Sequence, residues 1–430
     1  MIKKLLLCAV VLSQFAISCS SDETEPEKEP VTEEPTKEPV KEPVKDLTLA
    51  EQIAALVKQP YSALTPADQK VKLEAEANEM LVQLDKSKSS SAIAAIENLN
   101  ILLDLKGIDI FNGKNDNKVE DVLNVSGVYG VYTWNNTAKS WTKTESTTEL
   151  KFVFPAKKSQ TANNAILSAK SVSSTVKVEL YDGYNGTKEI NDNIFLPSSS
   201  DATLTIDNVQ AASFTQTAKY SSKNQSPDEF AYKMILNDGY TWEMSGKKAA
   251  ENTSKASLTY NAKNLISFNI GSSASIDALI DNDALVQYRG KANGLIQLMD
   301  NFVIIADVDL AAAAADDAAL EKSLVRPTNY NSPTYYTDIS NYNLKVTEGA
   351  VANFNKNMKL ILVSKKDGTK IADIVQHTEK EDGDYETKYY NGVYYLKFSD
   401  KTEAEMSVYF SEGFDKFETK FEDFIKAFNK

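Results

Sequence analysis

The feature that most constrains this fold is a series of short β-type segments, separated by turn residues, that begins near residue 127. Residues 128–134 are rich in Val, Tyr and Trp, which favour strands, and Asn135-Asn136 then marks a turn. Asn237-Asp238-Gly239 separates residues 230–236 from 240–245 and is a strong hairpin signal. Repetition of this pattern predicts about ten strands in an antiparallel meander, because short connections join antiparallel neighbours. So long a sheet must curl, close or be covered on one face.

The other expected strands share a composition of Thr, Val, Tyr and Phe. Before residue 272 they are residues 139–143, 150–154, 175–181, 202–207, 214–220, 257–260 and 265–270. A mixed region over 272–356 follows and includes a predicted helix at 309–324. Later strands are expected at 360–363, 371–375, 385–390, 393–398 and 406–410. Asn391-Gly392 lies between two of them and predicts a tight turn.

Helices are expected before the strand-rich region. Residues 48–51 have the spacing of a capping box, and Thr65-Pro66 starts a second helix that runs to about residue 84. A third helix is expected over residues 91–107. Two consecutive antiparallel helices predict a hairpin whose apolar faces cover the sheet.

The C-terminal residues predict one more helix. Phenylalanines repeat at alternating spacings of three and four residues: Phe414, Phe417, Phe421, Phe424 and Phe428. That spacing lines one face of a helix, which we expect to dock on the sheet; the alternative is a site for a partner helix or an apolar ligand. The expected fold class is therefore α+β, a predominantly antiparallel β meander (a curled sheet or half-barrel) with an N-terminal helical hairpin and a C-terminal helix.

The first residues have the layout of a bacterial export signal. Lys3 and Lys4 are followed by an apolar run, residues 5–16, that is too short to cross a bilayer. Ala16-Ile17-Ser18-Cys19 comes next and resembles the lipobox of bacterial lipoproteins, although Leu is commoner than Ala at its first position. The resemblance implies cleavage before Cys19 and acylation of the chain there, with palmitate among the attached groups. The alternative is an ordinary secretory signal with an incidental cysteine.

The residues after Cys19 point to the cell surface. Ser20-Ser21-Asp22-Glu23 resembles the export signal of surface lipoproteins of Bacteroidota, and implies an outer-membrane protein that faces the cell exterior. The alternative is that this run only begins an acidic linker. Repeated proline in the residues that follow favours extended polyproline II conformation, so we expect a stalk. The predicted parts are a signal peptide (1–18), a lipidated stalk (19–46), a helical hairpin (47–110), an antiparallel β region (125–272) and an α+β region (284–430).

Composition excludes several classes of function. The net charge of −14 argues against a nucleic-acid partner, because phosphate binding needs a basic face. The two cysteines are Cys8, which leaves with the signal peptide, and Cys19, so no disulfide or thiolate metal site is expected. A single histidine, His377, is too few for most zinc sites, and we interpret it as a solvated surface residue. We therefore predict no metal and no cofactor.

No catalytic motif stands out, so we predict that the protein is not an enzyme. The acidic groups around residues 379–384 and 281–283 lie in polar runs typical of turns; the alternative, a glycosidase pair, needs two carboxylates facing one cleft. Residues 112–117 are rich in Asn but lack the spacing of a calcium loop, and we interpret them as a turn.

Aromatic side chains near strand ends are the candidate ligand-binding residues: Trp141, Trp242, Tyr390 and Tyr394. Exposed aromatic rings stack on the C–H faces of sugars. The alternative is that these rings pack in the core or across strands, as aromatic residues commonly do.

Two functions remain open. The first is a non-catalytic cell-surface module for binding or adhesion, with a glycan or host macromolecule as its ligand. The second is a carrier of an apolar ligand in a cavity between the sheet and the helices. That layout resembles the half-barrel of lipoprotein-carrier proteins, and the resemblance is one of architecture alone.

Overall fold

The computed structural model describes residues 47–105, 126–220, 225–282, 288–383 and 386–410. Several sequence predictions lie outside these ranges: the signal peptide, Cys19, the stalk, residues 112–117 and the phenylalanine stripe of residues 414–428. The described residues build one continuous sheet of 16 strands, in which most strands lie beside their neighbours in the chain. The exception is one end, where the order is β4-β3-β1-β2 and β1 runs parallel to β3.

The strands are longest in the middle of the chain and shortest near its end. They are β1 Gly130–Asn135, β2 Ser140–Thr144, β3 Leu150–Phe154, β4 Ala165–Asn185, β5 Lys188–Ile206, β6 Val209–Lys219, β7 Glu229–Leu236, β8 Tyr240–Lys247, β9 Asn252–Tyr260, β10 Lys263–Ser272, β11 Lys291–Leu298, β12 Phe302–Asp309, β13 Met358–Ser364, β14 Thr369–Lys380, β15 Tyr390–Lys397 and β16 Glu403–Glu405. The helices are α2 Leu49–Val57, α3 Pro66–Asp85, the 3-10 helix η1 Lys86–Ser89, α4 Ser91–Leu105, α6 Ile276–Asp281, α7 Leu310–Ser323, α8 Tyr335–Asn357 and α9 Met406–Tyr409.

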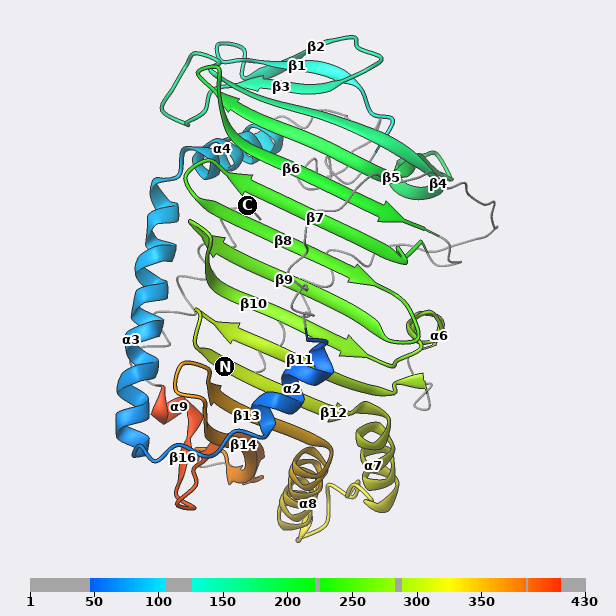
Figure 1. Ribbon diagram of the computed structural model, residues 1–430. Helices are drawn as coiled ribbons and strands as arrows, with labels where there is room; N and C mark the ends of the chain where they lie inside the picture. Colours follow the sequence, from blue (N-terminus) through cyan, green and yellow to red (C-terminus); the bar gives the residue numbers. More distant parts are fainter. Residues whose placement is uncertain (1–46, 106–125, 221–224, 283–287, 384–385, 411–430) are drawn as a thin grey trace, which may run out of the picture.

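The predicted fold class is confirmed: the chain is α+β and is dominated by an antiparallel meander that curls without closing (Figure 1). The two β regions expected from the sequence belong to the same sheet, because β10 pairs with β11 over residues 266–272 and 292–298. Turn chemistry explains the meander. Gly239, between β7 and β8, has a φ of +111°, and Gly368, between β13 and β14, has a φ of +64°. Glycine adopts such positive angles without strain.

The sheet has one face that carries the main core and an opposite face that is mostly polar. Alternation along β12 illustrates this, since Phe302 packs in the main core while Val303 and Ile305 point to the other side. We call the side of Phe302 the core face and the side of Val303 the open face. On the open face α2 covers a small area, where Ile53 packs against Val303, Ile305 and Val363.

Helix α3 lies along the strand ends on the core face (Figure 1). Thr65 starts it as predicted, since its hydroxyl accepts a hydrogen bond from the Asp68 amide at 3.2 Å. Its buried apolar stripe is Leu73, Ala77, Met80, Leu81 and Leu84. Helix α4 then turns away toward β1–β3 instead of returning along α3, so the two helices do not pack as the expected hairpin (Figure 1).

The turn expected at Asn391-Gly392 is wrong. Both residues lie within β15, where Gly392 is opposite Thr378 of β14. A Cβ atom at Gly392 would lie 3.2 Å from Val351 Cγ2, so the glycine makes room for α8 to pack on the sheet. An Asn-Gly pair usually marks a turn. Here the glycine is explained by the close packing of α8, a helix that lies far away in the sequence.

Other local features also differ from the sequence predictions. In the expected strand of residues 385–390, the described residues 386–389 are not strand, and β15 begins only at Tyr390. Residues 406–410 do not form the expected strand, because Met406–Tyr409 is the short helix α9. Helix α8 is not among the predicted helices. The hydroxyl of its N-cap, Thr334, accepts no capping hydrogen bond from a backbone amide of the first turn, and its apolar residues are interrupted by polar ones, so the usual start and periodicity signals are weak.

Candidate functional site

The four aromatic residues proposed as ligand contacts do not come together. Trp141 belongs to β2, at one edge of the sheet, whereas Tyr390 and Tyr394 belong to β15, beside the other edge. Trp242 is 7% exposed within the main core, so its ring offers no face to a ligand. Cys19, the predicted lipidation site, lies outside the described residues.

The remaining three rings are half-buried. Trp141 packs edge-on against Trp134 with ring centroids 5.2 Å apart, and its Nε1 donates to the Leu102 carbonyl at 3.3 Å. Tyr394 packs edge-on against Phe354 of α8 at 5.5 Å, and burial raises the pKa of its phenol. These are contacts of packing side chains, and a binding role for the three residues stays a prediction.

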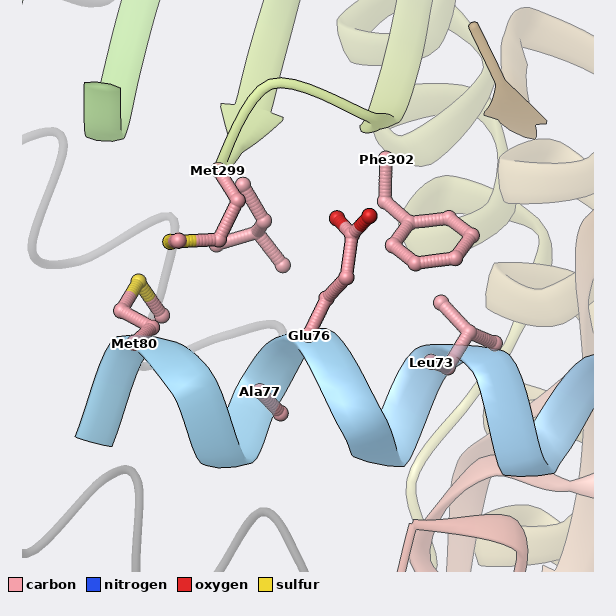
Figure 2. Close-up of a pocket in the computed structure, with 7 residues that line it drawn as sticks. Leu73, Glu76, Ala77, Met80, Met299 and Phe302 are labelled. Atoms are coloured by element: carbon pink, nitrogen blue, oxygen red, sulfur yellow. The ribbon is translucent and has the colours of Figure 1, made fainter. Parts of the chain in front are cut away.

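Side chains fill the space where α3 meets the connection between β11 and β12. Figure 2 shows the residues that meet there: Leu73, Glu76, Ala77 and Met80 from α3, Met299 from the β11–β12 turn and Phe302 from the start of β12. The volume left among them is about 10 Å³. Ligand pockets measure several hundred Å³, so this interface is a packed core contact.

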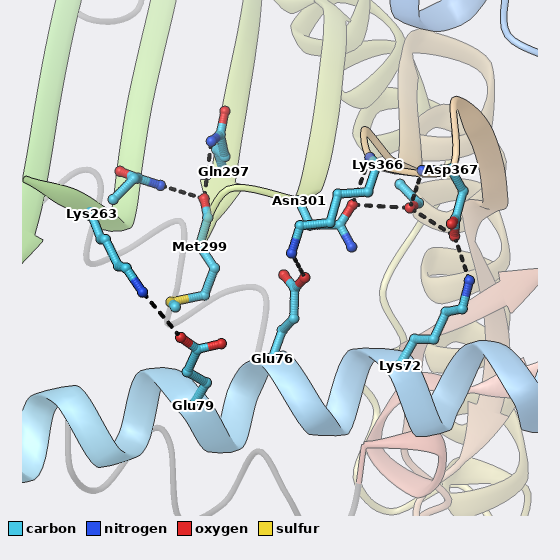
Figure 3. Close-up of polar contacts among 11 residues, drawn as sticks. Lys72, Glu76, Glu79, Lys263, Gln297, Met299, Asn301, Lys366 and Asp367 are labelled. Carbon is cyan, nitrogen blue, oxygen red and sulfur yellow. Dashed lines mark hydrogen bonds and ion pairs between the residues drawn. The ribbon is translucent and has the colours of Figure 1, made fainter.

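Ion pairs fasten α3 to the turn between β13 and β14 (Figure 3). Lys72 Nζ lies 2.9 Å from Asp367 Oδ2, and Lys366 Nζ lies 2.5 Å from Glu76 Oε1. The hydrogen bond from Lys72 holds the pKa of the Asp367 carboxyl below its usual value. Asn301 supports the turn, because its side-chain oxygen accepts from the Lys366 amide at 2.9 Å. Apolar packing and charge together argue against α3 as a lid that opens.

The open face of β6–β10 carries a hollow of about 640 Å³. Three consecutive residues of each strand line it: 215–217, 231–233, 243–245, 255–257 and 267–269. The middle residues of four of these triplets contact the main core: Tyr232, Met244, Ala256 and Phe268. Because strand side chains alternate, the outer residues of each triplet project from the open face and form the walls, while the backbone between them forms the floor.

Five of the ten outer lining residues carry short hydroxyl side chains. They are Thr215, Thr217, Ser245, Ser257 and Ser267, with the amide of Asn269 beside them. The hollow crosses five strands, a distance of about 20 Å at roughly 4.8 Å per strand spacing. Lys233 Nζ and Glu243 Oε1 form an ion pair of 2.6 Å on one wall. Lys255 is the remaining charged residue of the lining.

His377 lies at the surface of β14, on the open face but apart from the hollow. Its Nε2 is 2.5 Å from Glu403 Oε2 on β16, and Lys397 Nζ is 3.2 Å from the other carboxylate oxygen. Burial raises the pKa of Glu403, but the hydrogen bonds with His377 and Lys397 outweigh it and hold that pKa below its usual value. His377 and Lys397 thus both contact Glu403, in a network of a hydrogen bond and an ion pair that fastens the edge strand.

Clusters of possible metal ligands and membrane-spanning helices were both sought in the described part of the chain. Within those ranges no group of three or more His, Cys, Asp or Glu residues is placed to hold a metal ion. Among the helices of the same ranges, none has the length and hydrophobicity of a membrane span.

Comparison with known proteins identifies no relative of this chain. The chain has no significant match to a protein-family model, to a curated protein or to a solved structure. Its function has to be argued from the geometry of the hollow and from the signals at the N-terminus.

Proposed function

We propose that this chain is a non-catalytic binding module of the cell surface, held in the outer membrane by lipid on Cys19, and that it binds a glycan in the hollow of the open face. The hollow is the observation that carries the proposal. Its volume of about 640 Å³ lies in the range of ligand sites. Its hydroxyl and amide side chains both donate and accept hydrogen bonds, which suits a ligand that is itself rich in hydroxyl groups.

The shape of the hollow favours a linear chain over a compact ligand. It runs across five strands, and the hydroxyl, amide and charged side chains of its walls follow one another at the strand spacing of about 4.8 Å. A polysaccharide presents hydroxyl groups along its whole length and meets several of them at once. Each neutral hydrogen bond contributes only about 0.5 to 1.5 kcal/mol net, so useful affinity requires several contacts in series.

The charges of the lining favour binding over hydrolysis. Glu243 is the one carboxylate among the described residues that line the hollow, and it is paired with Lys233 at 2.6 Å. Glycoside hydrolysis generally uses two carboxyl groups about 5 to 9.5 Å apart. The part of the lining that the structure describes holds no second carboxylate, and we therefore propose recognition without cleavage.

The N-terminal anchor suits this arrangement. Helix α2, the first described helix, packs on the open face, and Leu49 lies beside Gly271 of β10, the strand that ends the hollow. The chain that leads from Cys19 therefore joins the fold on the side that binds the glycan. A stalk of roughly 25 residues in polyproline II conformation spans about 75 Å and lifts that face away from the lipid.

A glycan panel tests the proposal with the lipid-free chain from Ser20 onward and two matched variants. Ser257→Gln places a longer neutral side chain on a wall of the hollow, and Thr259→Gln makes the same kind of change on the same face of β9, outside the lining. We expect the first variant to bind the best neutral linear glycan about tenfold more weakly, a change of about 1.4 kcal/mol, and the second to bind it as the unaltered chain does. Equal losses in both variants, or no binding to any neutral linear glycan, would refute the proposal.

The alternative, a carrier of an apolar ligand, has less support. It needs an apolar cavity between the sheet and the helices, and the interface of α3 with the β11–β12 turn leaves about 10 Å³. Native mass spectrometry of the purified chain separates the two functions. An apolar adduct that co-purifies would favour the carrier, whereas the mass of the chain alone agrees with the binding module.

A further inference from the structure

A second exposed surface lies where α7 joins α8. Tyr330 is 74% exposed, Tyr336 is 51% exposed and Val325 is 89% exposed. Exposed apolar and aromatic side chains that gather in one place mark interaction sites more often than singly scattered ones do. The α7–α8 connection lies at the opposite end of the sheet from β1–β3 and apart from the hollow over β6–β10 (Figure 1).

Three tyrosines form this surface, and we call Tyr330, Tyr335 and Tyr336 the tyrosine cluster. The ring centroids of Tyr330 and Tyr335 lie 4.8 Å apart with an interplanar angle of 47°, and those of Tyr335 and Tyr336 lie 5.5 Å apart at 72°. Tyr335 is the inner, half-buried ring, and desolvation and the neighbouring Tyr330 raise the pKa of its phenol. The two outer rings are therefore supported by the inner one while they stay open to solvent.

Local hydrogen bonds order the loop that carries the cluster. The Ser332 amide donates to the Asn329 carbonyl at 3.1 Å, and the Tyr335 amide donates to the Ser332 carbonyl at 3.1 Å. The Thr334 hydroxyl donates to Asp338 Oδ2 at 2.7 Å. Because the loop is already ordered, a ligand that binds there loses less free energy to ordering the side chains and backbone.

Arg326 lies in the same loop as Tyr330, and it is informative that this residue is an arginine and not a lysine. Of the 47 Lys and Arg residues of the chain, only Arg289 and Arg326 are arginine. Arg326 is exposed in the α7–α8 loop that also carries Tyr330, and its positive charge opposes the rise in the pKa of the Tyr335 phenol. Among the described residues, no carboxylate forms an ion pair with it. A guanidinium binds a carboxylate through two parallel hydrogen bonds, which the ammonium group of lysine does not offer.

From this arrangement we infer that the tyrosine cluster and Arg326 form a binding site for a carboxylated sugar, such as a uronic acid or sialic acid residue. The guanidinium binds the carboxylate, and an outer tyrosine ring stacks on the C–H face of the sugar ring. The amides of Asn329 and Asn331 lie in the same loop and supply hydrogen bonds to sugar hydroxyls. The site shares no residue with the hollow, so it stands whether or not the hollow binds a glycan.

An acidic peptide offers the same carboxylate, but the loop suits a sugar better. Peptides usually bind by setting side chains into a groove or by adding a strand to a sheet edge. The tyrosine cluster is neither, since its outer rings project into solvent from a loop and from the first turn of a helix. A saturated sugar ring needs only an open aromatic face and polar groups at its rim.

Isothermal titration calorimetry of the lipid-free chain tests the inference. The probes are trigalacturonate and sialyllactose, with galactotriose and lactose as their neutral counterparts. We expect each carboxylated sugar to bind at least about tenfold more tightly than its counterpart, because a charge-assisted bidentate pair is lost in the neutral sugar. Ser257→Gln, which alters the hollow, should leave this binding unchanged, so a failure of the hollow and a failure of this site are distinguishable.

Substitutions test separately whether Arg326 binds the carboxylate and whether a tyrosine ring stacks on the sugar. Arg326→Lys keeps the charge but removes the paired hydrogen bonds, and should weaken carboxylated sugars about tenfold while it leaves neutral ones unchanged. Tyr330→Ala should weaken both kinds of sugar. The matched controls are Arg289→Lys and Tyr184→Ala; Tyr184 is 67% exposed on β4. Both controls should bind as the unaltered chain does, and circular dichroism verifies that every variant is folded.

Three results would overturn the inference. The first is that neither carboxylated sugar binds. The second is that carboxylated and neutral sugars bind equally well, or that Arg326→Lys has no larger effect than Arg289→Lys. The third is that a tetraglutamate peptide binds at Arg326 while neither carboxylated sugar does, which would make the loop a site for acidic peptides.

Discussion

Leu73 tests whether α3 is an integral part of the core. Its side chain is 3% exposed and lies at the interface with Met299 and Phe302 that Figure 2 shows. Leu73→Ala removes three carbon groups, and at about 0.8 kcal/mol for each the lost transfer free energy is about 2.4 kcal/mol. The interface holds only about 10 Å³ of free volume, so the shortened side chain leaves a new cavity. With the cavity included we expect a loss of about 3 to 4 kcal/mol in the free energy of unfolding.

Val71 supplies the matched control on the same helix. Its side chain is 66% exposed, and Val71→Ala should change the free energy of unfolding by less than about 0.5 kcal/mol. The assay is urea unfolding followed by circular dichroism, in which a lower midpoint at an unchanged slope reports lost stability. A loss below about 1 kcal/mol for Leu73→Ala, or equal losses in the two variants, would show that α3 is not packed into the core as described.

Two further changes probe the end of the sheet near β15. Glu403→Gln removes a carboxylate whose folded pKa lies below the ordinary 4.5, so the group stabilises the fold above that value and loses its effect as pH falls through the folded pKa. The variant should therefore be less stable than the unaltered chain in urea near pH 7 and should approach it near pH 3, and an equal difference at both values would contradict the ion-pair network. Gly392→Val sets a side chain against Val351, which a Cβ atom alone would approach to 3.2 Å, and should cost about 1 to 3 kcal/mol. An unchanged melting temperature would mean that α8 does not pack closely on β15.

The strands could be predicted because their evidence is local. Alternation and turn residues act over a few positions, and Gly239 takes the positive φ that the expected hairpin requires. Gly392 shows where the same kind of signal fails. Its conformation is extended, and the reason for a glycine is the close approach of Val351 on α8, a contact that no short window of sequence contains.

The candidate site could not be predicted in the same way, because it depends on which face of the sheet is covered. Along β9, Leu258 is buried while Ser257 and Thr259 are half-exposed, and the alternation alone predicts two unlike faces. The amount of each face that stays open is decided by helices elsewhere in the chain. Trp242 illustrates the consequence. Its place near a strand end was compatible with an exposed ligand-binding ring or with a buried core residue, and the structure places it in the core beside Met234.

The tyrosine cluster was visible in the sequence only as a loop rich in Pro, Asn and Tyr. The loop is a candidate binding site because Tyr330 and Tyr336 are exposed and because Arg326 lies near Tyr335. Those properties depend on where α7 ends and α8 begins, and α8 lacked a clear start signal. The scarcity of arginine in the chain was the one sequence signal that could have singled out Arg326.

Photoaffinity labelling tests most directly whether the open face of β6–β10 is the glycan site. A neutral linear oligosaccharide that carries a diazirine group should label peptides that contain residues 215–217, 231–233, 243–245, 255–257 and 267–269, and excess unlabelled oligosaccharide should abolish the labelling. Labelling confined to other parts of the chain, such as α3 or the far half of the β4–β5 ribbon, would contradict the assignment of the site.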